Sequence, residues 1–213
     1  MQKFTLLHGV AAPMMFDNID TDAITPSAAG RSTSSDLGAM LFNNARYHLD
    51  GSENPEFVFN QAKFRHSSIL VTGKNFGCGS SRERAVWALM AFGIRCVVAP
   101  SFADIFYDNS LQNGLLPVVL PDAECEALAA QLEKNEEPII TVDLIQRQVT
   151  FPDQSKHSFA ISGEQRSALL EGLDEISVIL KYETRISRFE QEDMKSRPWI
   201  YADIGTGRLE QQS

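Results

Sequence analysis

The residues best suited to chemistry lie in one short stretch, Asn75-Phe76-Gly77-Cys78-Gly79-Ser80-Ser81-Arg82-Glu83. It falls between a predicted apolar strand at 68–72 and a predicted helix at 80–92. Gly77 and Gly79 lack side chains, so a ligand can approach the backbone there. The helix start directs free N–H groups and a partial positive charge at the same point. The stretch therefore predicts a binding site for carboxylate or phosphate oxygens.

Three polar side chains at the start of the predicted helix would complete such a site. Arg82 can hold a carboxylate through two parallel hydrogen bonds, and Ser80 and Ser81 would place two hydroxyls beside it. A structural explanation stays open, because Ser80 and Glu83 also fit the S-x-x-E capping box. The two explanations are compatible, since one serine can cap the helix while the other faces a ligand. A dinucleotide fingerprint does not fit, because it needs a glycine where Arg82 stands.

The elements that must position these residues alternate between strands and helices. Besides the strand and helix above, the pattern predicts strands at 4–10, 94–99 and 115–120 and a helix at 101–113. Gly93, Gly114 and Gly172 are expected to end helices, because a left-handed residue commonly follows the last turn. Repeated strand–helix–strand units imply parallel pairing with right-handed crossovers, so the predicted fold class is α/β.

The second half of the chain predicts shorter elements. Asp122 is expected to cap a helix at 123–135. Ser162 and Gln165 fit a capping box for a helix at 163–171. The remaining pattern predicts a hairpin from 139–144 and 148–151, a strand at 157–161 and a helix near 185–194.

We expect a single domain over residues 1–195. Residues 27–61, rich in Ser, Gly and Asn, are expected to form a long irregular excursion within it. Residues 196–213 are poorly patterned and are expected to form a flexible tail. A chain of 213 residues that is 43% hydrophobic can bury a substantial core.

The charge balance and the apolar pattern limit the partners. The formal net charge is −9 and there is no dense Lys/Arg run, which argues against nucleic acid or an anionic membrane as the main partner. No run of about 18 apolar residues predicts a membrane-spanning helix. Residues 1–10 are interpreted as a first strand and not as a signal peptide. A reduced, cytoplasmic setting is expected.

The residue types that ligate metals are few and scattered. Cys78, Cys96 and Cys125 form no CxxC pair, and a cluster with four thiolate ligands cannot be built from three cysteines. No two of the four histidines have metal-ligand spacing. No metal site is therefore expected on this chain, and Cys78 is expected to be a small buried residue of low reactivity.

Four blocks of sequence, spread over nearly the whole chain, belong together. They are Gly77-Cys78-Gly79-Ser80-Ser81-Arg82-Glu83, Asn18-Ile19-Asp20-Thr21-Asp22-Ala23-Ile24, residues 99–117 beginning Ala99-Pro100-Ser101-Phe102, and residues 159–180 containing Gly172-Leu173-Asp174-Glu175-Ile176. Their types and order resemble the small-subunit family of 3-isopropylmalate dehydratase, a branch of the aconitase superfamily.

The resemblance implies the swivel-domain fold of aconitases, a β/β/α three-layer arrangement with parallel strand–helix units. It implies a hydro-lyase that interconverts 2-isopropylmalate and 3-isopropylmalate by dehydration and rehydration in leucine biosynthesis. Such a small subunit is active only with a large subunit, which would carry a [4Fe-4S] cluster. This chain itself would bind no cofactor.

The resemblance also assigns roles to individual residues. Ser80 would be the general base at the carbon beside a carboxylate, with its alkoxide stabilised by the helix start and Arg82. Ser81, Arg82 and the backbone at Gly79 would hold a carboxylate of the small dicarboxylate substrate. Asp22 would orient the reacting groups.

Some polar residues have open alternatives. Asp20 and Asp22 could instead be ordinary turn residues, which aspartates commonly are. Asp104 and Asn109 could support the site from behind, with capping of the 101–113 helix by Ser101 as the equal alternative.

Two departures from the family pattern bear on the substrate. Arg84 stands where the family usually has histidine. The loop at 27–36 lacks the family's substrate-recognising arginine, and Arg31, the only nearby guanidinium, is expected to bind the substrate in its place from a shifted position. These departures motivate two alternatives. One is a related dehydratase or hydratase subunit for another 2-hydroxy diacid, such as a methylated malate. The other is a dicarboxylate-binding module without chemistry.

Overall fold

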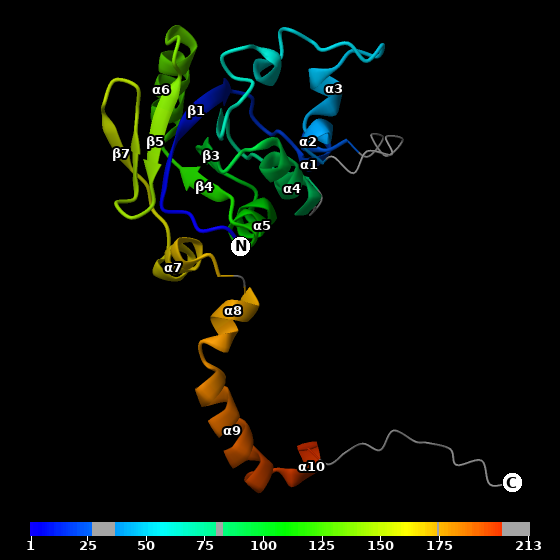
Figure 1. Ribbon diagram of the computed structural model, residues 1–213, viewed down its shortest axis with the longest axis vertical. Helices are drawn as coiled ribbons and strands as arrows, with labels where there is room; N and C mark the ends of the chain where they lie inside the picture. The colour runs from blue at the N-terminus through cyan, green and yellow to red at the C-terminus, as the bar shows by residue number, and fades with distance from the viewer. Residues whose placement is uncertain (27–36, 80–82, 174, 202–213) are drawn as a thin grey trace, which may run out of the picture. The chain divides into compact units, whose positions relative to one another are not determined.

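The structure is a computed structural model that describes residues 1–26, 37–79, 83–173 and 175–201 (Figure 1). The chain divides into two compact units, Met1–Asp174 and Glu175–Ser213. This boundary lies before residue 195, where we expected the domain to end. The single domain over 1–195 stays a prediction.

A mixed sheet forms the centre of the first unit. Its strands are β1 (Leu6–Met14), β2 (Ile69–Thr72), β3 (Cys96–Ala99), β4 (Leu116–Val119), β5 (Ile139–Asp143), β6 (Gln148–Thr150) and β7 (Lys156–Ser158). Within the described residues the strand order is β4-β3-β2-β1-β5-β6-β7. Strands β1 to β4 pair in parallel, whereas β5, β6 and β7 pair antiparallel.

Strand β1 belongs to both halves of the sheet. Its first part pairs with β5, from Leu6 opposite Asp143 to Val10 opposite Ile139. Its last part, Ala11 to Met14, pairs with β2. The strand is therefore longer than the predicted 4–10, because residues beyond Val10 find a second partner.

The helices of the first unit cover both faces of the sheet. They are α1 (Thr21–Ile24), α2 (Leu37–Met40), α3 (Asn43–Arg46), η2 (Val58–Asn60), α4 (Glu83–Phe92), α5 (Asp104–Asn113), α6 (Asp122–Lys134) and α7 (Gly163–Glu171). The predicted parallel strand–helix units are confirmed. Gly114 and Gly172 end α5 and α7 in the left-handed conformation, as expected. Ser162 and Gln165 form the predicted capping box.

The side chains of each strand pack alternately into two hydrophobic cores, one on each face of the sheet, because neighbouring side chains of a strand point to opposite faces. Ile69 and Val71 pack in the core that α6 covers with Cys125, Leu128 and Leu132. Leu70 and Val97 pack in the core that α4 covers with Ala85, Ala88 and Leu89. Figure 1 shows α6 and α4 on either side of the strands. Burial on both faces explains why these strands are almost wholly apolar.

The prediction that Asp122 caps α6 is wrong. Pro121 occupies the cap position and makes no side-chain cap bond, and Asp122 is the first helical residue. Its carboxylate instead lies 2.5 Å from Nζ of Lys74, in the loop that follows β2. A long-range ion pair therefore takes the carboxylate that the local pattern assigned to the helix.

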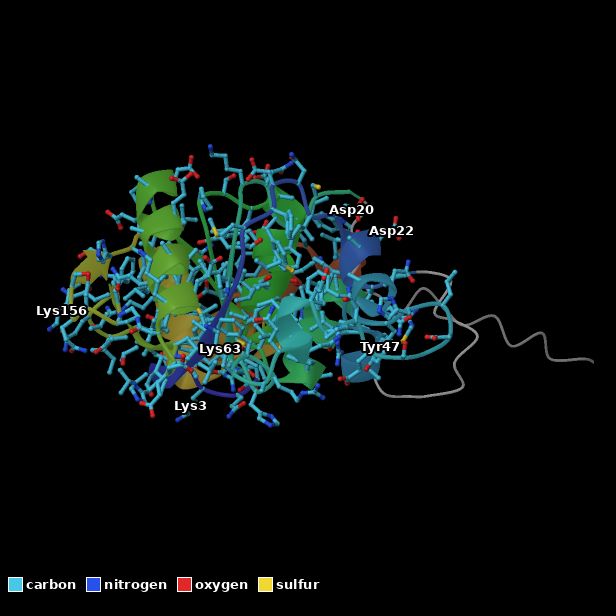
Figure 2. All side chains as sticks on the ribbon, turned by 90° about the horizontal axis from the view of Figure 1, so that it is seen from above. Lys3, Asp20, Asp22, Tyr47, Lys63 and Lys156 are labelled. Carbon is cyan, nitrogen blue, oxygen red and sulfur yellow. The ribbon has the colours of Figure 1, made fainter. Side chains whose placement is uncertain are left out.

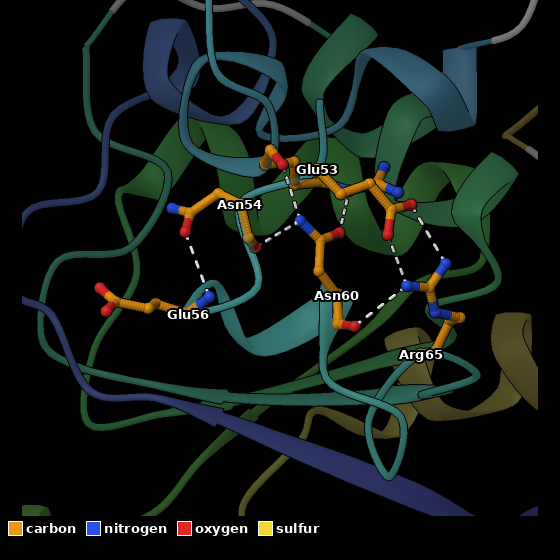
Figure 3. A network of polar contacts seen from close by, with 6 residues as sticks. Glu53, Asn54, Glu56, Asn60 and Arg65 are labelled. Atoms are coloured by element: carbon orange, nitrogen blue, oxygen red, sulfur yellow. Dashed lines mark hydrogen bonds and ion pairs between the residues drawn. The ribbon is translucent and has the colours of Figure 1, made fainter. Parts of the chain in front are cut away.

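The excursion after Pro26 is partly ordered by a buried arginine and by Asn60, whose bond to Asn54 is drawn in Figure 3. Arg46, 8% exposed, donates to the carbonyl oxygen of Gly38 at 3.2 Å and to Oδ1 of Asn60 at 3.4 Å, and its guanidinium lies 5.0 Å from the ring centre of Phe92. Nδ2 of Asn60 donates to the carbonyl oxygens of Arg46 at 2.7 Å and Asn54 at 2.8 Å. These bonds hold the short helices of the excursion against α4.

The second unit is helical over its described residues. It contains α8 (Glu175–Leu180), α9 (Glu183–Ser196) and α10 (Pro198–Tyr201). The predicted helix near 185–194 is confirmed as α9. Of the predicted tail, residues 202–213 lie outside the described part, and residues 198–201 are helical. No described helix of either unit is long and apolar enough to cross a membrane.

Replacing Asn60 with leucine should destabilise the first unit. The change removes one of the two donors from the carbonyl oxygens of Arg46 and Asn54, which keep the N–H groups of Asn54 and Phe57. It also removes the acceptor of the buried Nε of Arg46, which costs about 1–3 kcal/mol. Urea unfolding of Asn60→Leu measures this loss of free energy. The matched control is Gln61→Leu, because that amide donates to the carbonyl oxygen of Glu56 at the surface. Equal stability of the two variants would contradict the role given to Asn60.

Candidate functional site

Three loops meet beyond the carboxyl ends of β1, β2 and β3. Residues 15–20 follow β1, residues 73–79 follow β2, and residues 100–103 follow β3. In open α/β sheets, this end of neighbouring parallel strands is where ligands bind. The described part of the predicted anion-binding stretch, residues 75–79, therefore lies at this end of the strands.

Main-chain hydrogen bonds tie the middle loop to the loop after β1. The N–H of Gly77 donates to the carbonyl oxygen of Ile19 at 2.8 Å, and the N–H of Thr21 donates to the carbonyl oxygen of Cys78 at 2.9 Å. Nδ2 of Asn75 donates to Oδ1 of Asn18 at 2.8 Å. These bonds fix the start of α1 beside the end of the middle loop.

The middle loop is tied equally to the loop after β3. The N–H of Phe76 donates to the carbonyl oxygen of Ser101 at 3.2 Å, and the N–H of Ala103 returns a bond to the carbonyl oxygen of Phe76 at 3.0 Å. The hydroxyl oxygen of Ser101 accepts from the N–H of Asn75 at 2.9 Å. The alternative that Ser101 caps α5 is therefore wrong, because Ala103 occupies that cap position.

Gly77 and Gly79 differ in what a side chain at each position would contact. Gly77 has φ +76°, and a Cβ there would lie 2.2 Å from the Phe106 ring. Its missing side chain makes room for a core phenylalanine, so the expectation that a ligand approaches there is wrong. Gly79 has φ +94° and is exposed, and a Cβ would reach only ordinary contact with Asp20 and Thr21. Of the two, Gly79 is the one whose backbone stays open.

The aspartates of the loop after β1 separate into two roles. Oδ1 of Asp20 accepts from the N–H of Ala23 at 2.6 Å and caps α1, which is the structural alternative. Asp22 is exposed in the first turn of the same helix. Figure 2 shows Asp20 and Asp22 near each other at the start of α1, on the opposite side of the view from Lys156 of β7. The structure thus brings Gly79 and Asp22 to one edge, as the site requires.

The remaining predicted site residues fall in the two gaps of the described structure, 27–36 and 80–82. Ser80, Ser81, Arg82 and Arg31 lie outside the described residues. Oε1 of Glu83 accepts from Nδ2 of Asn113 at 3.2 Å, so at least one carboxylate oxygen faces α5 and not the start of its own helix.

The two ends of the 27–36 segment are both held against α4. Helix α1 packs on α4 before the segment, and α2 packs on it afterwards. A Cβ on Gly38 would lie 3.0 Å from the backbone of Ala91, which shows how close the second contact is. Arg84 donates to Sδ of Met40 at 3.0 Å and joins the first turn of α4 to α2. The flanks of Arg31 and of Arg82 are therefore neighbours in space.

Several supporting residues were missed by sequence reasoning. Phe106 and Asn18 hold the loops through contacts with Phe76 and Asn75, and Asn113 joins α5 to the first turn of α4 through Glu83. Asn18 and Asn75 both have positive φ, which asparagine tolerates better than most residues. Asparagines in two polar loops were thus a signal that could have been used.

A cleft lies beside these loops. Its volume is about 410 Å³, and its lining includes Ser101, Phe102, Asp104, Tyr107 and Asp108. Partial burial raises the pKa of Tyr107, with a smaller effect from the negative charge of Asp108. Asp104 faces this cleft, so its supporting role, like that of Asn109, stays a prediction.

The described residues contain no group of three or more His, Cys, Asp or Glu side chains that could hold a metal ion. Cys96 and Cys125 are buried, in β3 and α6. Cys78 is half-buried, and its Sγ lies 3.4 Å from the carbonyl oxygen of Asn18. The prediction that Cys78 is buried is therefore wrong.

The comparisons place this arrangement among known proteins. Residues 1–123 match the model of the aconitase C-terminal domain. The 3-isopropylmalate dehydratase small subunit of Dinoroseobacter shibae is 47% identical over 94% of this chain and its own whole length. The protein of that name from Gluconacetobacter diazotrophicus is 48% identical over 93% of this chain and 97% of its own. The chain belongs to the 3-isopropylmalate dehydratase small-subunit family.

The solved structures agree with this family. A 3-isopropylmalate dehydratase chain from Methanocaldococcus jannaschii aligns with a TM-score of 0.62 and 27% identity, over 86% of this chain and 98% of that one. The predicted aconitase-type α/β fold is therefore confirmed.

Alanine at Gly77 should destabilise the fold far more than alanine at Gly79. Both positions have positive φ, which costs about 1 kcal/mol for a residue with a side chain. Only at Gly77 does the new Cβ collide with Phe106, which adds several kcal/mol of strain. Urea unfolding of Gly77→Ala and Gly79→Ala measures the difference. Equal losses would show that Phe106 does not fill the space above Gly77.

In the folded protein, one cysteine should react with iodoacetamide much faster than the other two. Burial raises the pKa of the Cys96 thiol strongly and, with neighbouring carboxylates, raises that of Cys125 to about 12. Few thiolates form at either, and the reagent cannot reach them. Mass mapping of partly labelled protein should find the label on Cys78, with all three labelled after unfolding. Labelling of Cys96 first would contradict the burial described.

Proposed function

We propose that this chain is the small subunit of a 3-isopropylmalate dehydratase. The enzyme is a hydro-lyase that interconverts 2-isopropylmalate and 3-isopropylmalate in leucine biosynthesis, and it acts in the cytoplasm as a complex with a large subunit. The observation that carries the proposal is the 47% identity over the whole length of a relative with that name. The joined loops at Gly79 and Asp22 support it.

The large subunit is proposed to carry the [4Fe-4S] cluster. The described residues of this chain do not fit such a group, because two of its three cysteines are buried in separate elements and no cluster of ligands gathers. Lewis-acid activation of the leaving hydroxyl group is therefore assigned to the large subunit and not to this chain.

The proposed work of this chain is proton transfer and carboxylate binding. Ser80 removes the proton from the carbon beside a carboxylate and returns a proton to the alkene formed after loss of water. A serine alkoxide needs stabilisation, which the free N–H groups at the start of α4 and the Arg82 guanidinium would supply. Ser81, Arg82 and the open backbone at Gly79 bind a substrate carboxylate.

Two further residues are proposed to orient and bind the substrate. Asp22 lies exposed in the first turn of α1, beside the end of the middle loop, and is assigned an orienting role. Arg31 belongs to the segment whose two flanks pack on α4, so that it can supply a second guanidinium for the diacid. The alternatives of a methylated-malate enzyme or a binding module are not favoured, because the relatives carry one name.

Replacing Ser80 with alanine should abolish turnover without preventing assembly. A general base contributes about 10²–10⁴-fold to the rate, so kcat of the complex should fall by at least ~10²-fold. The measurement is alkene formation from 3-isopropylmalate by the complex with a cluster-bearing large subunit, with assembly checked by gel filtration. The control is Ser155→Ala, whose hydroxyl bonds Asp153 between β6 and β7. Full turnover by Ser80→Ala would refute its assignment as the base.

A further inference from the structure

The second unit carries an unusual number of exposed apolar side chains for its length. The exposed fraction is between 38% and 69% for Ile176, Ile179, Leu180, Tyr182, Ile186, Phe189, Met194, Trp199, Ile200 and Tyr201. In α9 the residue that is buried is a charged one, Asp193. Exposed apolar groups gathered in one segment mark a surface that binds another surface.

On α9 these side chains share one face. Tyr182, Ile186 and Phe189 follow one another at intervals of four and three residues, which is the spacing of one side of a helix. Arg188 and Glu192 form an exposed ion pair at 3.0 Å. The helix is therefore amphipathic, and Arg188 and Glu192 pair with each other on its polar side.

The corner between α9 and α10 is built by its own polar contacts. The carboxylate of Asp193 accepts from Nε of Arg197 and, at 3.0 Å, from the hydroxyl of Tyr201. The Arg197 guanidinium holds the pKa of this carboxyl below its usual value, with the Tyr201 hydroxyl acting in the same direction. The corner thus presents Trp199 and Ile200 in a fixed order after the apolar face of α9.

We propose that the segment 175–201 is a docking element for the larger subunit of the enzyme. This inference rests on the proposed function, which supplies the existence of that subunit. The segment is rich in Tyr, Trp, Phe and Met, the types that are enriched at protein interfaces. The ten exposed apolar side chains, of which five are of these types, would offer about 100 Å² each, which together exceeds the roughly 800 Å² that one partner gives to a stable interface.

The charge of the segment favours a protein partner and argues against the alternatives. Its five acidic and five basic residues balance, so it offers no attraction to nucleic acid or anionic lipid. A second copy of this chain is a poor occupant, because each copy has a net charge of −9 and the neutral segment does not offset the repulsion.

The first unit ends just after α7, and α7 is tied back to the start of the chain. Leu169 of α7 is fully buried, and the carbonyl oxygen of Gly172 accepts from the amino group of Met1 at 2.9 Å. The N–H of Phe4 donates to the carbonyl oxygen of Leu169 at 2.9 Å. The two ends of the first unit are thereby joined, and its core is complete at α7.

The test uses the full chain with the double substitution Ile186→Ser and Phe189→Ser. The dissociation constant with the purified cluster-bearing large subunit, measured by sedimentation, should rise at least ~25-fold, because each of the two side chains at an interface centre contributes at least a factor of about five. At saturating large subunit, kcat should stay within about twofold of the unchanged complex. The matched control is Leu49→Ser with Ile145→Ser, two exposed apolar residues of the first unit.

Hydrogen exchange on the same samples decides among the occupants. Residues 175–201 should exchange fast in the chain alone and slowly once the large subunit is bound. An unchanged dissociation constant for the double variant would overturn the proposal. So would protection of the segment in the isolated monomer, which assigns it to the first unit, or a homodimer that the substitutions abolish.

Failure of the proposed function would look different. An unchanged complex that assembles but does not interconvert the isopropylmalates would refute the activity and leave the docking element standing. An active complex in which the double variant binds as tightly as the unchanged chain would refute the docking element alone.

Discussion

The fold depends most on the hydrogen bonds that hold residues 75–79 between two other loops. Gly77 and Phe76 use their main-chain N–H groups on opposite sides, toward Ile19 and Ser101. Each such bond contributes only about 0.5–1.5 kcal/mol, but leaving a buried partner unsatisfied costs more. Since Phe106 fills the space above Gly77, the loop has little freedom to move. The end of the loop, at Cys78 and Gly79, is thereby held beside the start of α1.

Strand β1 makes this arrangement possible by changing partners at Val10. Before that residue it pairs antiparallel with β5, and after it, in parallel with β2. The parallel half delivers three successive loops to one edge, where α1 and α4 begin. The antiparallel half adds no loop to that edge but extends the core under α6. The parallel half therefore brings the three loops together, while both halves contribute side chains to the core under α6.

The sequence predicted regular elements well because their signals are local. Apolar runs marked β2 to β4, and Gly114 and Gly172 marked two helix ends where they adopt positive φ. What it could not predict depended on partners far along the chain. Asp122 looked like a cap until Lys74, 48 positions earlier, paired with it. Gly77 looked like a ligand contact until Phe106 packed against it. The site block itself was found through its resemblance to the family, because capping alone explained Ser80 and Glu83 equally well.

The described part of the proposed site is more exposed to solvent than the proposed chemistry allows. Gly79 and Asp22 are exposed to solvent in this chain. A serine can act as a base toward carbon only where water is excluded and fixed dipoles replace it, because the alkoxide is otherwise protonated by solvent. A second surface must therefore cover this edge before the reaction can proceed. An enzyme divided in this way needs association energy from residues that do not react, since the reacting groups are small, polar and few. A separate apolar segment, such as the one that ends in Trp199 and Tyr201, supplies that energy without making the site itself hydrophobic.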